Sequence, residues 1–309
     1  ARGRRKSTTE ATDETLDKGI DEIKLRDIIQ NNIYGVDINA ESIEITKLSL
    51  FLKIVSENKR LFSLSSGILE GNSLISEEEV AGKLSFDWNV GFGEIFNPGM
   101  GGKGGFDIVI GNPPYLRLQG ITKNDAKSKK YYKENYPVTT TGRYDYYILF
   151  LDKGLKLLNE NGKMGYIVPH KFTSALFGVG IRKLISENKF LKKFLHFNQY
   201  YVFKAKTYTG VMILDRQKNE EFEFKEILNI KNEELEPIVS ALTKKDFVKI
   251  PTSSLGETPW SFRYGIIGQI LNKVDNSGPD LLELFERVSA GIDTGYDDLY
   301  ILEKVEDKG

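Results

Sequence analysis

The chain has 309 residues, a formal net charge of −1 and no cysteine. This length is sufficient for one large α/β domain and a smaller piece. The balanced charge gives no overall positive field that would indicate nucleic-acid binding, so basic patches must be sought locally. The lack of cysteine excludes disulfides and cysteine–metal clusters and fits a reducing, cytoplasmic compartment. No apolar run approaches the length of a membrane span, so no membrane partner is expected.

The N-terminal stretch, ARGRRKSTTEATDE, lacks the apolar core of a secretory signal. The sequence starts at Ala1 without a Met, and we therefore expect it to be part of a longer polypeptide.

A strand followed by an acid and a helix is predicted near the start of the chain. Residues 33–38 form a short apolar strand, Asn39 is a helix cap, and apolar residues at helical spacing predict a helix over 40–57. In doubly wound sheets an acid at the end of such a strand accepts hydrogen bonds from both ribose hydroxyls of a cofactor. Asp37, with Ile38 beside it, is therefore a candidate cofactor-binding residue. A capping or solvated carboxylate is the alternative interpretation.

A further short strand and turn are predicted over 67–74. Asn72 and Ser73 in this turn are candidates for contact with an adenine edge. Polar residues at such positions more often simply close the turn, and that alternative stays open.

The most informative motif is FDIVIGNPPY at 106–115, where a buried strand runs into two prolines. The Asn112 side-chain oxygen and the Pro113 carbonyl offer two acceptors for an exocyclic amine, and Tyr115 offers a ring that stacks on it. Pro113 and Pro114 make the turn rigid and donate no hydrogen bond of their own. The residues thus predict a site for an amino group on a flat ring; an ordinary strand-to-loop turn is the alternative.

Basic residues follow this turn. From Arg117 to Lys133 there are six basic residues and one acid, in a stretch that reads as a polar loop. Such a loop could hold phosphates around an extruded base or be merely solvated. Lys204 and Lys206, further along the chain, form a second local positive patch. The candidate nucleic-acid contacts are therefore Arg117, Lys127, Lys129, Lys130, Lys204 and Lys206.

The order of these motifs resembles that of S-adenosylmethionine-dependent N6-adenine DNA methyltransferases, in particular the modules of type IIG restriction–modification enzymes. The family's next elements also have counterparts here. They are similar to the run 142–145 that opens a helix over 146–159, to Gly162 as the stop of that helix, and to the strand over 163–168. The resemblance implies a catalytic role for Asn112, Pro113, Pro114 and Tyr115, with Asn112 also touching the cofactor. It implies that Phe203 stacks on the second face of a flipped adenine, although a Phe at a strand edge is commonly a core residue.

The resemblance also implies S-adenosylmethionine as cofactor, double-stranded DNA as substrate, and a nuclease and full target-recognition domains elsewhere in the parent chain. One family element is not found: nothing in residues 1–30 supplies the glycine loop after the family's first strand. We therefore expect the chain to begin after that loop, to lack its first strand, and to bind cofactor weakly.

The fold expected from this resemblance is a Rossmann-like α/β sheet, mainly parallel, with helices on both faces and an antiparallel edge pair. Strands are predicted at 33–38, 67–71, 106–111, 163–168, 194–199 and 208–215. Residues 1–236 are expected to form the truncated catalytic domain. Residues 237–309 are expected to form a linker and the start of a target-recognition region, because the run SAGIDTGY at 289–296 resembles the phrase that opens that region.

The sequence gives little evidence for a phosphate-binding loop or a metal site. The glycine run at 99–105 precedes its strand, unlike a phosphate loop. His170 and His196 have no acids at metal spacing, so no metal is expected. The alternatives left open are a methyltransferase of protein glutamine side chains or of guanine N2 in RNA, and a non-catalytic recognition piece of a larger assembly.

Overall fold

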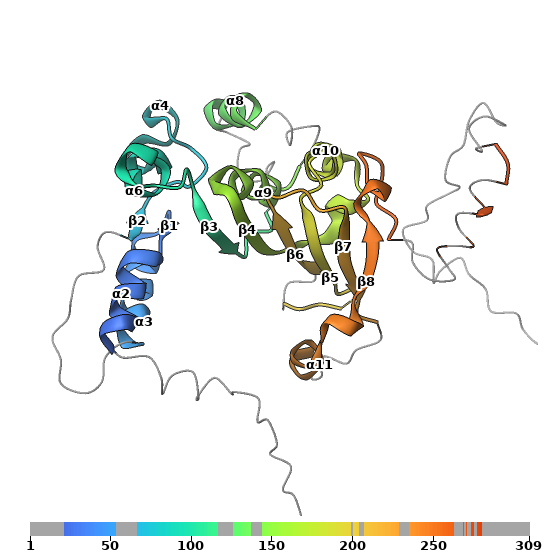
Figure 1. Cartoon of the computed structure of the whole chain (residues 1–309). Coiled ribbons are helices and arrows are strands. Elements are labelled where there is room, and N and C mark those ends of the chain that lie inside the picture. Colours follow the sequence, from blue (N-terminus) through green and yellow to red (C-terminus); the bar gives the residue numbers. More distant parts are fainter. Residues whose placement is uncertain are drawn as a thin grey trace, which may run out of the picture. The chain divides into compact units, whose positions relative to one another are not determined.

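The structure is a computed structural model of the chain, and Figure 1 shows its arrangement. It describes residues 22–53, 67–116, 126–136, 144–198, 200–203, 207–228 and 235–262, with a few short stretches between 268 and 279. The chain divides into two compact units, Ala1–Trp260 and Ser261–Gly309. No helix of the described residues is long and apolar enough to cross a membrane.

The strands of the first unit form two sheets in the described part of the chain. A small sheet pairs β1 (Gly35–Asp37) in parallel with β2 (Ile68–Glu70). The large sheet has the order β3-β4-β6-β5-β7-β8. Its strands are β3 (Phe106–Gly111), β4 (Leu158–Pro169), β5 (Leu191–His196), β6 (Thr209–Asp215), β7 (Glu221–Glu226) and β8 (Val248–Pro251).

The expectation of a mainly parallel sheet is wrong, because the large sheet is mixed. β3 and β4 are parallel, as are β5 and β7, whereas β6 runs antiparallel to both β4 and β5, and β8 antiparallel to β7. The antiparallel pair β5–β6 is present as expected but lies inside the sheet. The sequence reasoning missed β7 and β8, which extend the sheet beyond that pair.

Helices cover both faces of the large sheet (Figure 1). α9 (Tyr146–Leu157) packs on the face that carries Met164 and Tyr166 so closely that a Cβ on Gly154 would lie 2.4 Å from the Met164 sulfur. α10 (Val179–Glu187) lies next to α9. On the opposite face, α11 (Leu235–Ala241) packs over a cluster around Leu195 and Ile227.

Two predicted helices have different ends. α9 stops at Leu157 and β4 starts at the next residue, so Gly162 is not a helix stop. Gly162 lies inside β4, where a Cβ would come within 2.7 Å of the Phe106 carbonyl oxygen; the close approach of β3 requires glycine there. α3 (Ala40–Leu52) is capped by Asn39 as predicted, since the Asn39 side chain accepts from the Ser42 N–H. Residues 54–57 of the predicted helix lie outside the described residues.

An aromatic cluster joins the small sheet to β3. Tyr34, just before β1, contacts Phe106, the first residue of β3, with ring centroids 5.6 Å apart. Phe92 contacts both rings, at 5.2 and 6.1 Å. Phe92 lies between two of the short helices that connect β2 to β3 in the chain, which are α4 (Glu78–Ala81), η1 (Gly82–Leu84), α5 (Trp88–Gly91), α6 (Gly93–Phe96) and η2 (Pro98–Met100).

The face of β3 away from α9 is bare. Ile108 and Ile110 point to this face and are 68% and 81% exposed. A parallel strand of an α/β sheet normally has apolar cover on both faces. The described residues provide that cover on the α9 side only.

Residues 237–260 belong to the same compact unit as the sheet, so the expected boundary after residue 236 falls inside that unit. β8 pairs with β7, and the Trp260 N–H donates to the Thr173 carbonyl oxygen at 2.7 Å. The sequence showed no clear periodicity here because the elements are short: α11, η6 (Lys244–Asp246), β8 and η7 (Thr252–Ser254). The run 289–296 lies outside the described residues.

Candidate active site

The Asn112–Tyr115 turn directly follows β3, as predicted. Asn112 and Pro114 are exposed and Pro113 is buried, so the turn is anchored in its middle and presents the Asn112 side chain to solvent. Two prolines fix the backbone, so the Asn112 and Pro113 carbonyls keep their directions without any ligand. The turn can therefore offer one fixed acceptor, the Pro113 carbonyl, next to the exposed Asn112 side chain, whose oxygen is the second acceptor for an amino group.

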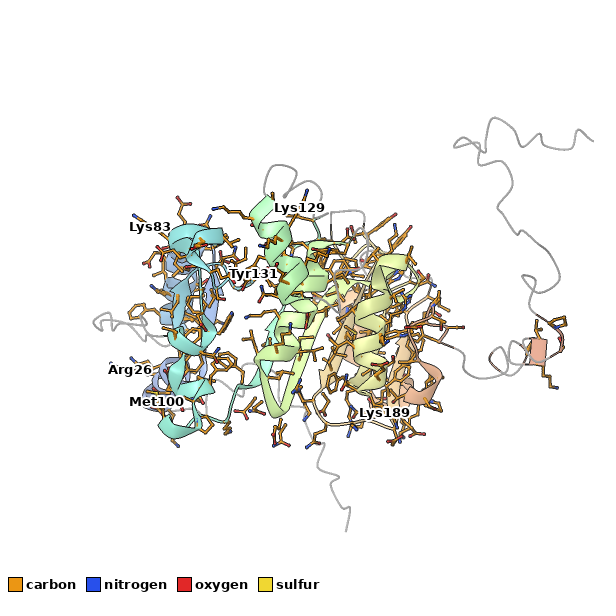
Figure 2. All side chains as sticks on the ribbon, turned by 90° about the horizontal axis from the view of Figure 1, so that it is seen from above. Arg26, Lys83, Met100, Lys129, Tyr131 and Lys189 are labelled. Atoms are coloured by element: carbon orange, nitrogen blue, oxygen red, sulfur yellow. The ribbon has the colours of Figure 1, made fainter. Side chains whose placement is uncertain are left out.

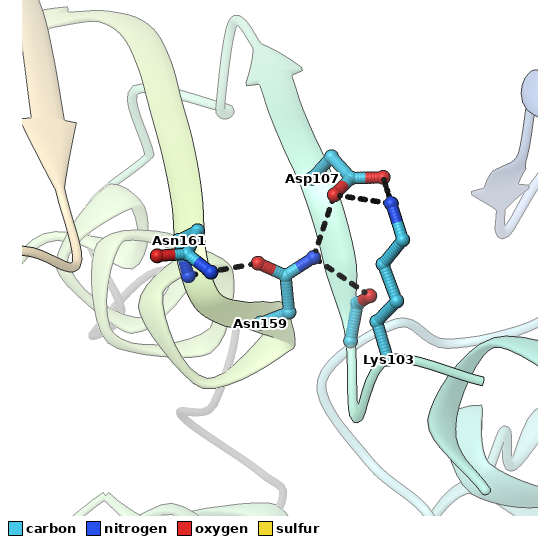
Figure 3. Close-up of polar contacts among 5 residues, drawn as sticks. Lys103, Asp107, Asn159 and Asn161 are labelled. Carbon is cyan, nitrogen blue, oxygen red and sulfur yellow. Dashed lines mark hydrogen bonds and ion pairs between the residues drawn. The ribbon is translucent and has the colours of Figure 1, made fainter. Parts of the chain in front are cut away.

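A polar network fixes the start of β3 to β4 (Figure 3). The Asn159 amide donates to the Asp107 carboxylate at 2.9 Å and to the Gly105 carbonyl at 3.4 Å. The Lys103 ammonium lies 3.1 Å from both Asp107 oxygens. The Asn159 hydrogen bond, and then Lys103, hold the pKa of Asp107 below its ordinary value. These contacts fix the strand that ends in the Asn112 turn.

Tyr115 is half-buried and held on two sides. Its hydroxyl donates to the Ile167 carbonyl oxygen near the end of β4 at 3.0 Å. Its ring meets the buried ring of Tyr147 edge-on, with centroids 6.4 Å apart. Burial raises the pKa of Tyr115 to about 12, so the phenol stays neutral and acts as a donor at physiological pH. The ring is therefore a neutral, oriented surface.

Phe203 contacts Tyr115 although the two residues are far apart in sequence. The ring centroids are 6.0 Å apart with planes at 61°. Phe203 and Tyr115, which are predicted to stack on the two faces of one base, thus lie beside each other; we call them the Tyr115–Phe203 clamp. That Phe203 stacks on a base remains a prediction.

Asp37 ends β1, and its carbonyl pairs with Gly71, which follows β2 and precedes Asn72 in the chain. The Asp37 carbonyl accepts from the Gly71 N–H at 2.9 Å, and its exposed side chain accepts from the Asn39 N–H at 2.8 Å. Ile38, beside it, exposes more than half of its side chain to solvent. A carboxylate beside an exposed apolar group fits the ribose and base of a nucleoside.

Asn72 and Ser73 also serve the turn itself. The Asn72 side-chain oxygen accepts from the Leu74 N–H at 3.0 Å, and the Ser73 carbonyl accepts from the Trp88 indole N–H at 3.0 Å. The turn-closing interpretation therefore holds for Asn72, whereas the Ser73 contact is made by its backbone and not by its side chain. Their contact with a cofactor remains a prediction.

The predicted basic residues are only partly described. The Lys127 ammonium donates to the Glu79 carbonyl at 3.1 Å, and Lys130 lies 3.9 Å from a Glu134 carboxylate oxygen. Lys129 is exposed on the same helix. Arg117, Lys204 and Lys206 lie outside the described residues.

The expectation of a polar loop up to Lys133 is wrong for residues 126–133, which form most of α8 (Ala126–Asn135). Tyr131 and Tyr132 are buried, and Figure 2 shows Tyr131 directed from α8 towards the segment around α4. The Tyr131 hydroxyl accepts from the Ser76 N–H at 3.1 Å. These tyrosines hold α8 to the rest of the unit. The sequence reasoning missed this because most other residues of α8 are polar and exposed, so the two buried rings lie within a charged stretch.

The two histidines, distant in sequence, are neighbours in the structure. The rings of His170, after β4, and His196, at the end of β5, have centroids 4.1 Å apart. The Asn198 N–H donates to His196 Nδ1 at 3.3 Å, and a Glu226 oxygen lies 3.5 Å from the same nitrogen. Burial, with a smaller contribution from His170, lowers the pKa of His196 to about 4.

No sequence pattern signals this pair, since it depends on β6 pairing with both β4 and β5. Among the described residues no group of three or more histidine, aspartate or glutamate side chains has the geometry to hold a metal ion.

The model of the Eco57I restriction-modification methylase family matches residues 31–203. The chain belongs to this family. The matched span runs from just before β1 to Phe203, so it contains the Asp37 turn, the Asn112 turn and the Tyr115–Phe203 pair. The resemblance inferred from the motif order is confirmed.

Two curated relatives illustrate the similarity. The chain is 29% identical over 298 residues to the type II restriction enzyme and methyltransferase RM.Eco57I of Escherichia coli, covering 91% of this chain and 28% of that protein. It is 28% identical over 220 residues to the type II methyltransferase M.BstVI of Geobacillus stearothermophilus, covering 64% of this chain and 37% of the relative. The chain thus corresponds to a minor part of each relative's length.

Two solved structures share the fold. A nuclease-deletion mutant of the type ISP restriction–modification enzyme LlaGI, in complex with a DNA substrate mimic, has a TM-score of 0.57 at 18% identity and covers 77% of this chain and 22% of its own. A DrdV–DNA complex has a TM-score of 0.58 at 16% identity and covers 76% of this chain and 25% of its own.

Proposed function

We propose that the chain is the catalytic part of a DNA methyltransferase that transfers a methyl group from S-adenosylmethionine to N6 of a flipped adenine. The observation that carries the proposal is the Tyr115–Phe203 contact beside Asn112. Two aromatic rings next to a rigid pair of acceptors match a flat ring with an exocyclic amine. Family membership independently supports methyl transfer.

The chemistry rests on orientation by the turn. The Asn112 side-chain oxygen and the Pro113 carbonyl accept the two N6 hydrogens, which directs the nitrogen lone pair towards the methyl donor. S-adenosylmethionine would supply the methyl group and leave as S-adenosylhomocysteine, whose sulfur keeps the bonding pair, while one N6 proton passes to solvent; no covalent enzyme intermediate is needed. Pro114 keeps the turn rigid. Tyr115 stays neutral because burial raises its pKa, so it contributes stacking and not proton transfer.

Base entry requires a rearrangement of the clamp. Atoms in contact lie about 3.5 Å apart, so a base between two parallel rings holds them roughly 7 Å apart. Tyr115 and Phe203 are closer, with centroids at 6.0 Å and tilted planes. Phe203 therefore moves away from Tyr115 when a base enters, while the hydrogen bond to Ile167 keeps Tyr115 in place.

The cofactor would be held along the carboxyl ends of β1, β2 and β3. Asp37 suits the ribose hydroxyls and the exposed Ile38 suits the adenine ring, with Asn72, Ser73 and Asn112 completing the contacts. The exposed position of Asp37 and Ile38 supports this assignment. The methionine end has no candidate among the described residues.

A further parallel strand and its helix, contributed by a part of the parent protein outside these 309 residues, would complete the sheet. The bare face of β3, with Ile108 and Ile110 exposed, supports this addition. So does α3, where Ile45, Leu48 and Leu52 are exposed. A fully covered sheet would bury these apolar side chains and stabilise the unit.

Double-stranded DNA is the proposed substrate, and nuclease and target-recognition domains elsewhere in the parent protein are the proposed partners. The family description and the DNA-bound LlaGI and DrdV structures support DNA over protein glutamine or RNA guanine. Lys127, Lys129 and Lys130, with the undescribed Arg117, Lys204 and Lys206, are the proposed phosphate contacts.

The test is product analysis with the full-length protein. Unmethylated genomic DNA, total RNA and a mixed protein extract are each incubated with S-adenosylmethionine, and the products are hydrolysed and identified by mass spectrometry. We expect N6-methyladenine in DNA alone, and none from the Asn112→Ala protein. A methylated glutamine, a methylated guanine in RNA or a methylated cytosine as the product would refute the assignment.

A further inference from the structure

A stack of aromatic rings lies beside the candidate site and has no role in the proposed chemistry. The rings of Tyr201 and Tyr208 are parallel within 10°, with centroids 4.7 Å apart. The Tyr201 hydroxyl donates to the Tyr208 hydroxyl at 2.9 Å. The ring of His170 continues the stack against Tyr208, at 6.1 Å and 20°. Both tyrosines remain exposed, at 38% and 39%.

This stack is on the same edge of the sheet as Tyr115. His170 follows β4 three positions after Ile167, whose carbonyl receives the Tyr115 hydroxyl. Tyr208 immediately precedes β6, and Phe203, which contacts Tyr115, lies between the two stacked tyrosines in sequence. A nucleic-acid strand that delivers a base to Tyr115 would therefore pass close to the stack.

The sheet holds the stack in place. The His170 N–H donates to the Tyr208 carbonyl at 3.2 Å, and the Phe197 N–H donates to the Thr209 carbonyl at 3.2 Å. His170 Nε2 lies 3.3 Å from the Asn198 carbonyl oxygen. Rings that are already ordered lose little conformational entropy when a flat ligand stacks on them.

The stack is also uncharged near neutral pH. Burial lowers the pKa of His170, so its ring is neutral, and the hydrogen bond with Tyr201 raises the pKa of Tyr208. A neutral aromatic surface with electronegative faces favours a flat ring over a phosphate.

We propose that Tyr201 and Tyr208 form a stacking platform for a second nucleobase, one next to the flipped target in the same strand. When the target base leaves the duplex its neighbour loses a stacking partner, and the platform replaces it. This inference rests on the proposed function, because it takes nucleic acid as the substrate. It gives Tyr201 and Tyr208 a binding role separate from the Tyr115–Phe203 clamp.

The test uses the full-length protein and two fluorescent single strands of equal length, one with mixed bases and one with abasic sugars throughout. Tyr201→Ala should weaken binding of the base-containing strand by roughly tenfold, as expected for the loss of one stacked base. Binding of the abasic strand should not change. Tyr201→Phe, which keeps the ring but not the hydroxyl, should bind both strands like the unaltered protein.

Tyr208→Ala should behave like Tyr201→Ala if its melting temperature is unchanged. Tyr201 lies outside every strand, so its variant tests the proposal even if Tyr208→Ala fails to fold. Unchanged binding of both strands by Tyr201→Ala, or equal weakening of both, overturns the platform. A proline-rich peptide provides a further test. If it binds the unaltered protein more tightly than the base-containing strand does and displaces that strand, the surface is a peptide site and the platform is refuted.

The platform and the proposed function fail separately. If the unaltered protein methylates adenine in DNA but Tyr201→Ala binds both strands normally, only the platform is refuted. If no adenine is methylated while ring-dependent strand binding persists, the proposed reaction is refuted and the platform stands.

Discussion

The Tyr115 hydroxyl donates a hydrogen bond to the Ile167 carbonyl oxygen at 3.0 Å, which connects the turn after β3 to the end of β4. Neighbouring parallel strands thus hold the stacking ring by its polar end and leave its face for a ligand. Tyr115 thus has two distinct parts: the hydroxyl, which positions the ring, and the ring, which offers a face for stacking.

Removal of the ring should abolish methylation, whereas removal of the hydroxyl should not. Tyr115→Ala and Asn112→Ala should lower kcat/KM of the full-length protein by at least roughly a hundredfold, because stacking or the amine acceptor is lost. Tyr115→Phe loses a hydrogen bond of about 1 kcal/mol, so kcat/KM should fall only about fivefold. Radioactive methyl transfer to DNA measures both.

Affinity for S-adenosylmethionine, measured by calorimetry, should stay nearly unchanged in these variants. Full methylation by either alanine variant would be incompatible with the proposed base site.

Asp37→Asn in the full-length protein should weaken S-adenosylmethionine binding by roughly tenfold to a hundredfold, since a hydrogen bond to a charged acceptor contributes roughly 1.5–3 kcal/mol. Glu70, opposite Asp37 on β2, is also exposed and is the matched control. Glu70→Gln should leave the affinity unchanged. If the two variants weaken binding equally, the effect is general electrostatics and not a ribose contact.

Stability should depend on pH through His196. The unfolded chain takes up this proton near pH 6.5 but the folded chain only near pH 4, so between these values the unfolded state binds more protons and stability falls as the pH falls. This depression corresponds to roughly 3 kcal/mol at most. Burial raises the pKa of Glu226, which acts in the opposite direction at lower pH.

We therefore expect His196→Gln to flatten the decline in melting temperature between pH 6.5 and 4, and Glu226→Gln to steepen the lower part of it. Thermal melts across this range provide the measurement. An unaltered slope in His196→Gln would assign the decline to other groups.

The motifs were predictable because each is local. The strand before Asn112 and the Asn39 cap depend on neighbouring residues, so periodicity and residue type locate them correctly. The Tyr115–Phe203 contact is not local, and only the family resemblance suggested it. Neither the local sequence patterns nor the family resemblance suggested the His170–His196 pair.

The errors also have physical causes. β4 starts directly after α9 without a turn residue, and Gly162 satisfies a close strand approach instead of ending a helix. Short strands such as β8 carry too few residues to show a period of two. Tyr131 and Tyr132 read as loop residues because the lysines around them are solvated, although their own rings are buried.

The 309-residue chain by itself should bind S-adenosylmethionine weakly or not at all, because the described residues offer contacts for the adenosine end only. Calorimetry with the isolated chain and with the full-length protein would make the comparison. Micromolar affinity of the isolated chain would contradict the proposal that a further strand and loop complete the site.

The bare face of β3 offers a test of that missing layer by stability. Ile108→Ser and Ile110→Ser remove apolar groups that are exposed in this chain, so its melting temperature should hardly change. In the full-length protein an added helix would bury the same side chains, and each substitution should cost about 1.5–3 kcal/mol. Val90, also 81% exposed but on α5, is the matched control, and Val90→Ser should have no effect in either protein. If Ile108→Ser and Ile110→Ser leave the full-length protein as stable as Val90→Ser does, β3 stays uncovered there and no further layer packs on it.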